Sequence, residues 1–193
     1  MNEMGKQAID SLYTDFVENY GRLIEIGEVS FANSYKSQFA KVILLACASY
    51  FESATTLVIH SMLNPTRCNI TRQFIENKAL SRQYHALFDW NNRSVNKFFA
   101  FFGAEFKAFM AAKIRQDAHI KRSIDNFLEL GDLRNQLAHE NYALFRLNLT
   151  PEEIYEKFND AHTFIDNLNG YMNEYKEALQ AQLAKSHNGY SRK

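Results

Sequence analysis

The residues best suited to chemistry lie together in segment 133–142, LRNQLAHENY, which holds an arginine, an amide, an imidazole and a phenol. A guanidinium is permanently charged and shaped to bind phosphate through two hydrogen bonds. Histidine, with an ordinary pKa near 6.5, can accept or donate a proton at neutral pH. Arg134 and His139 are therefore the candidate catalytic pair for phosphodiester cleavage without a metal ion.

The pair is predicted to lie on one amphipathic helix spanning about residues 116–140. Its apolar positions recur at three- and four-residue spacings: Ile120, Ile124, Phe127, Leu128, Leu130, Leu133 and Leu137. Residues five apart on a helix are separated by roughly 140° and about 7.5 Å of rise, so one copy holds Arg134 and His139 awkwardly. Three features can close the gap: the reach of arginine, loosening of the last turn, or a second copy across a two-fold axis.

Three further residues are candidate supporting groups. Asn135 shares a helix face with His139 and can fix its tautomer or hold a phosphate. Tyr142, three residues beyond His139, can hydrogen-bond in the cleft. Glu52 stands in an otherwise apolar helix, where a carboxylate needs a partner or water. It either orients Arg134 or belongs to a solvent-facing polar stripe, and both alternatives remain open.

Four segments in order carry a family resemblance: LFDW at 87–90, NKFF at 96–99, FG at 102–103 and LGDLRNQLAH at 130–139. Their order and spacing resemble the RiboL-PSP-type branch of the HEPN superfamily, whose signature is R-x4-6-H, over about residues 40–142. The resemblance implies a helical bundle that commonly dimerises. Many such domains are metal-independent ribonucleases, often toxins or antiviral defence components. Some relatives carry a modified tyrosine in His-x-Tyr, but the spacing here is His-x-x-Tyr, which puts that role in doubt for Tyr142.

The expected function is thus a homodimeric endoribonuclease that cuts single-stranded RNA and leaves a 2′,3′-cyclic phosphate and a 5′-OH. The partners expected are RNA, a second copy of the chain and, for a toxin, an antitoxin. No metal or cofactor is expected, because carboxylates are scattered and no P-loop, dinucleotide fingerprint or HExxH spacing occurs. The alternative is a catalytically inactive RNA-binding or protein-interaction scaffold in which Arg134, Asn135 and His139 form a structural cluster.

Composition predicts an all-α chain, and the resemblance implies a HEPN-like bundle of long helices joined by short ones. The chain has 193 residues, 46% of them apolar, with only two prolines and seven glycines, which suits one domain with long uninterrupted helices. We expect that domain to span residues 1–184 and a disordered tail to span 185–193. The sequence lacks a signal-peptide pattern and a run of eighteen apolar residues, so a cytoplasmic protein without a membrane anchor is expected.

Helices other than the motif helix are predicted from periodicity and from start and stop signals. They span 5–26, 35–63, 71–77, 82–88 and 151–184. A turn is expected at 30–34 and a loop at 64–69. Thr150, Pro151 and Glu153 form a capping box at the last helix. Gly131 indicates either a kink or the close approach of another backbone.

Buried and basic regions are predicted from local composition. Cys47 and the phenylalanines between 98 and 109 fit a core better than a redox site or a base-stacking surface. Segment 65–125 holds 11 Lys and Arg against 5 Asp and Glu, although the whole chain is neutral. This asymmetry fits a modest RNA binder, and equally fits ordinary alternation of charge on helix surfaces.

Overall fold

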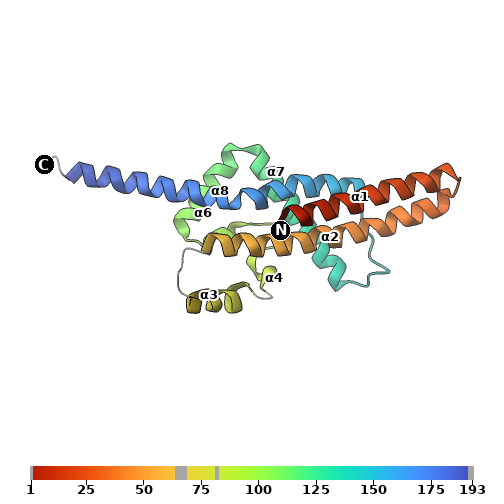
Figure 1. Ribbon diagram of the computed structural model, residues 1–193, viewed down its shortest axis with the longest axis horizontal. Helices are drawn as coiled ribbons and strands as arrows, with labels where there is room; N and C mark the ends of the chain where they lie inside the picture. Colours follow the sequence, from red (N-terminus) through yellow and green to blue (C-terminus); the bar gives the residue numbers. More distant parts are fainter. Residues whose placement is uncertain (1, 64–68, 81–82, 191–193) are drawn as a thin grey trace.

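The computed structural model describes residues 2–63, 69–80 and 83–190, and these residues form helices without a β-strand (Figure 1). The elements are α1 Asn2–Glu25, α2 Val29–Leu63, α3 Asn69–Ile75, the π-helix η1 Glu76–Leu80, α4 Tyr84–Leu87, α5 Asn96–Ala100, α6 Ala104–Gln116, α7 Ala118–His139 and α8 Pro151–Tyr190. The prediction of an all-α bundle with long helices and short connecting helices is confirmed.

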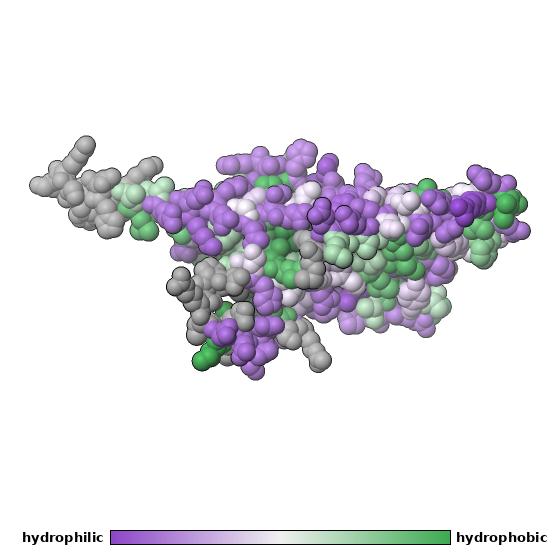
Figure 2. All heavy atoms as spheres, viewed as in Figure 1, coloured by the Kyte–Doolittle hydropathy of each residue, from purple (hydrophilic) through white to green (hydrophobic). Residues whose placement is uncertain are grey.

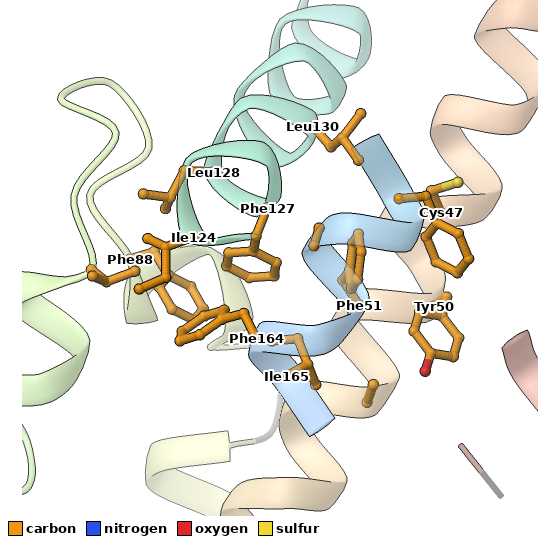
Figure 3. Packing of buried hydrophobic residues seen from close by; sticks show 14 of the residues in the cluster. Cys47, Tyr50, Phe51, Phe88, Ile124, Phe127, Leu128, Leu130, Phe164 and Ile165 are labelled. Carbon is orange, nitrogen blue, oxygen red and sulfur yellow. The ribbon is translucent and has the colours of Figure 1, made fainter. Parts of the chain in front are cut away.

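The long helices pack around α2, whose middle is apolar on most sides. Helix α1 returns along α2, α8 lies against both α2 and α7, and α6 lies against α7 and α8 (Figure 1). Buried aromatic rings from three elements meet at the centre (Figure 3). Phe127 of α7 meets Phe51 of α2 edge to face at 5.3 Å between ring centroids, and Phe164 of α8 at 5.5 Å. This core fixes α7, and with it the motif.

The turn between α1 and α2 is tighter than predicted. Gly27 has a φ of 81°, a left-handed conformation that glycine adopts without strain. The amide of Ala32 then donates to the carbonyl of Glu28, and α2 begins at Val29. The chain reverses within residues 26–28, so the expected turn at 30–34 and the helix start at residue 35 are wrong.

Cys47 is fully buried, as predicted, and burial raises the pKa of its thiol. Phe98, Phe99 and Phe106 are also core residues, whereas Phe101 is 59% exposed. Cys68 and most of the predicted loop at 64–69 lie outside the described residues.

By length and composition the stretch Val29–Met62 could span a membrane, but 56% of its most apolar window is buried in the fold, as in a bundle's central helix.

Gly131 allows the close approach of a side chain rather than of a backbone. Helix α7 runs through this position, and a Cβ added there would lie 2.0 Å from Cζ3 of Trp90. The Trp90 indole also donates from Nε1 to the carbonyl of His85 at 3.0 Å. Within the chain, the close contact at Gly131 is therefore made by the Trp90 ring, which packs against α7.

The predicted capping box at α8 is confirmed. The amide of Thr150 donates to Glu153 Oε2 at 2.8 Å, and the amide of Glu153 donates to Thr150 Oγ1 at 3.3 Å. The far end differs from the prediction, since α8 continues past Ala184 to Tyr190 and projects beyond the rest of the bundle (Figure 1). The predicted end of the last helix near residue 184 is therefore too early by about six residues.

Candidate active site

Arg134 is held near the end of α7 by side chains from two other elements. Its guanidinium lies 3.8 Å, from Nη2 to Oε2, from Glu52 of α2. Its Nη1 lies 3.0 Å from Nε2 of His85, on α4. The Arg134 side chain remains 26% exposed. The guanidinium is thus fixed in place while part of it stays accessible to a ligand.

Glu52 lies beside Arg134 and is also partly exposed to solvent, because the packing of α2 on α7 brings these two residues, far apart in sequence, together. The Glu52 side chain is 41% exposed. An ion pair this exposed to solvent stabilises a fold by about 0–1 kcal/mol. The pair therefore contributes more to the orientation of Arg134 than to the stability of the bundle.

His85 belongs to the cluster, although the sequence analysis did not select it. A guanidinium can only donate hydrogen bonds, so the His85 ring is the acceptor, with Nε2 at 3.0 Å and Nδ1 at 3.4 Å from Arg134 Nη1. The two residues are 49 positions apart, and no periodicity links α4 to α7. The one sequence signal was the position of His85 two residues before the LFDW segment at 87–90.

His139 is exposed in the last turn of α7. The helix keeps its regular geometry there, since the amide of Glu140 donates to the carbonyl of Gln136 at 2.9 Å. Loosening of the last turn therefore does not close the gap between His139 and Arg134. Within the described ranges, the His139 imidazole makes no hydrogen bond and remains available to a ligand or a second copy.

Asn135 and Tyr142 have different neighbours from those predicted. Asn135 Oδ1 accepts a hydrogen bond from Arg134 Nη1 at 3.3 Å, so the amide assists the guanidinium rather than the His139 imidazole. The Tyr142 ring lies under the ammonium of Lys41, 4.8 Å from Nζ to the ring centroid. The Tyr142 ring thus packs towards α2 and is not brought to Arg134.

A buried phenol lies beneath this cluster. Tyr84 of α4 is 6% exposed. Burial raises the pKa of Tyr84, the negative charge of Glu52 raises it further, and the positive charge of Arg134 opposes them. Tyr84 is therefore a neutral phenol at physiological pH and does not act as a base.

The arrangement supplies one fixed cation and an accessible imidazole on the same helix. Among residues 2–63, 69–80 and 83–190, no group of three or more His, Cys, Asp or Glu side chains is placed to hold a metal ion. The chemistry available from these side chains is stabilisation of a phosphate by Arg134 and proton transfer by His139.

Comparison with known proteins shows the family of the chain. A family model described as RiboL-PSP-HEPN matches residues 9–174, which include α7 and all the residues of the cluster. No curated protein and no solved structure matches the chain. The match extends well beyond the 40–142 region of the sequence resemblance and covers most of the chain. The chain therefore belongs to the RiboL-PSP-HEPN family of HEPN domains.

Proposed function

We propose that this protein is a metal-independent endoribonuclease that cuts single-stranded RNA. The observation that carries the proposal is the fixed, partly exposed guanidinium of Arg134 on the helix that ends in the exposed imidazole of His139. Family membership supports it, because the HEPN family is generally related to ribonucleases or to nucleotide binding.

In the proposed reaction a base removes the proton of a ribose 2′-OH, and the 2′-oxygen attacks the adjacent phosphorus. The bond from phosphorus to the 5′-oxygen breaks, and an acid protonates that oxygen. The products are a 2′,3′-cyclic phosphate and a 5′-OH. His139 serves as the base or the acid, and Arg134 stabilises the charge on the phosphorus oxygens.

A homodimer completes the proposed site. Within one chain Arg134 is engaged by Glu52 and His85, while His139 points from a regular last turn. A two-fold axis near the end of α7 would bring two arginines and two histidines to one phosphodiester. In this proposal the enzyme works in the cytoplasm as a toxin or antiviral defence component, and an antitoxin, where present, covers the site.

The reaction class is tested with purified protein and end-labelled RNA in EDTA. The expected result is cleavage that leaves 2′,3′-cyclic phosphate ends, with no cleavage of an otherwise identical oligonucleotide that has 2′-deoxyribose at the cut position. Cleavage that depends on added Mg²⁺, or that proceeds at the deoxy position, would contradict the proposed chemistry.

A non-catalytic scaffold is the second candidate, favoured by the contacts that already engage Arg134. If the Arg134 cluster exists to tie α7 to α2 and α4, Arg134→Ala should lower the melting temperature by several degrees. If Arg134 is catalytic, the same variant should lose activity with little change in melting temperature, since its ion pair with Glu52 is largely exposed.

A further inference from the structure

A polar pocket lies beside the chain segment that follows the motif. It has a volume of about 540 Å³ and is formed between the first half of α2 and segment 143–148. In Figure 1 this segment is the cyan connection between α7 and α8, beside α2. Its polar lining consists of Ser37, Gln38, Lys41, Arg146 and Asn148. The lining contains two cations and no carboxylate.

Lys41 carries a buried charge without a carboxylate partner. The residue is 4% exposed. Its ammonium donates to the carbonyl of Tyr142 at 2.7 Å and lies over the Tyr142 ring. In the part of the chain that the structure describes, Lys41 forms no ion pair. A carbonyl and a ring compensate a buried ammonium only partly, so the site favours an anion.

Arg146 adds a second positive charge at the rim of the same pocket. Its side chain is exposed, and it forms no ion pair with any described residue. The neighbouring Phe145 is 7% exposed and anchors the segment in the core. The amides of Leu144 and Phe145 also donate to the carbonyl of Asn141. The segment that forms the pocket wall is thus fixed, and the guanidinium of Arg146 is available to bind a phosphate.

The pocket is close enough to the motif to contact the same nucleic acid. Arg146 follows His139 by seven residues, so their Cα atoms lie at most about 25 Å apart. The Tyr142 carbonyl that holds the Lys41 ammonium lies only three residues after His139. An RNA strand that places one phosphate at Arg134 and His139 can therefore reach this pocket with a neighbouring stretch of its backbone.

We propose that the pocket of Lys41 and Arg146 binds a backbone phosphate of the single-stranded RNA, away from the scissile bond. The inference rests on the proposed function, because it assigns this pocket to the same substrate. Arg146 contacts the phosphate from the rim of the pocket, and the buried Lys41 supplies positive charge from its α2 wall.

The test measures binding rather than cleavage, so its failure is distinguishable from failure of the nuclease proposal. A fluorescent 2′-O-methyl oligonucleotide, which lacks the attacking hydroxyl, is titrated by anisotropy over a range of KCl concentrations. We expect Arg146→Gln to weaken binding about tenfold, the size of one charge-assisted hydrogen bond. The slope of log K against log salt should decrease by about 0.7, as for one lost contact with a single strand.

Arg22→Gln is the matched control, because it removes the same charge from an exposed position on α1, and it should bind like the wild type. Lys41→Met should also weaken binding, with a melting temperature near that of the wild type. Equal binding by Arg146→Gln and the wild type would overturn the proposal. If inorganic phosphate stabilises the wild type but not Arg146→Gln against heat, while oligonucleotide binding is equal in both, the pocket instead serves a free phosphate-bearing molecule.

Discussion

Arg134 depends on neighbours that fix the direction of its guanidinium. The imidazole of His85 accepts one of its hydrogen bonds, and the amide oxygen of Asn135 accepts another. The backbone of His85 is in turn held by the Trp90 indole. In the proposed site, His85 is therefore a positioning residue, which would keep Arg134 directed towards a bound phosphate.

His85→Leu should slow RNA cleavage about tenfold, because a poorly aligned guanidinium stabilises the transition state less well. His85→Gln should retain most of the activity, since its amide oxygen can accept the same hydrogen bond. The measurement is the cleavage rate with saturating RNA, beside the melting temperature. If the Leu and Gln variants lose activity equally, His85 has a role other than accepting this bond.

At the scale of elements, the packing of Trp90 on Gly131 joins the short helices to α7. The contact brings α4, and therefore His85, against the motif helix. The glycine is needed because the indole occupies the space of a side chain. The position of a site residue thus depends on a small residue one turn earlier on the same helix.

Gly131→Ala should destabilise the fold and displace the indole. Overpacking costs about 1–3 kcal/mol, which exceeds the gain of about 1 kcal/mol that alanine brings to a helix. Trp90 is the single tryptophan, so its fluorescence reports the displacement while heat denaturation reports the stability.

Gly170→Ala in α8 is the control, because nothing lies within 4 Å of the added Cβ. This variant should be as stable as the wild type or slightly more so. An unchanged spectrum and melting temperature in Gly131→Ala would mean that the ring does not rest on α7.

The sequence predicted elements better than their ends, and predicted the helix that carries the motif better than the side chains that surround Arg134. Apolar periodicity located α1, α2 and α7, and the Thr150 capping box located the start of α8. The early start of α2 was missed because the turn before it depends on the left-handed backbone conformation of Gly27, which the apolar periodicity does not reveal. The contact between His85 and Arg134 was missed because tertiary packing alone brings them together, whereas Glu52 was accessible to reasoning because a carboxylate in an apolar helix needs a partner.

At the scale of the whole molecule, one continuous core links the motif helix to α1 and to the first part of α8. His162 of α8 stacks on Tyr50 of α2 at 5.5 Å between ring centroids, and its Nδ1 lies 3.0 Å from Asp166. Burial lowers the pKa of His162 and nearby Lys6 lowers it further, while Asp166 and Asp10 act in the opposite direction. Burial prevails because the Asp166 side chain is 43% exposed, which weakens its attraction.

The stability of the fold should therefore decrease as the pH falls below 6.5, the ordinary value for histidine. Below pH 6.5 the unfolded chain binds a proton at His162 more readily than the folded chain does, which favours unfolding. Well above pH 6.5 His162 is unprotonated in both forms, so it adds no pH dependence there. The melting temperature of the wild type should fall between about pH 7 and about pH 5, and that of His162→Gln should fall less. Equal pH dependence in both proteins would exclude His162 as the cause.

The most direct test of the proposed site is the rate at which single-stranded RNA is cleaved in EDTA. The rate is measured for the wild type, for His139→Ala, for Arg134→Ala and for a mixture of the two variants that has been unfolded and refolded together. Each variant alone should lose at least about a hundredfold in rate, the contribution of one positioned acid or base. The mixture should recover part of the activity, because a mixed dimer joins an intact Arg134 to an intact His139. Full activity in both separate variants would contradict the proposed ribonuclease site.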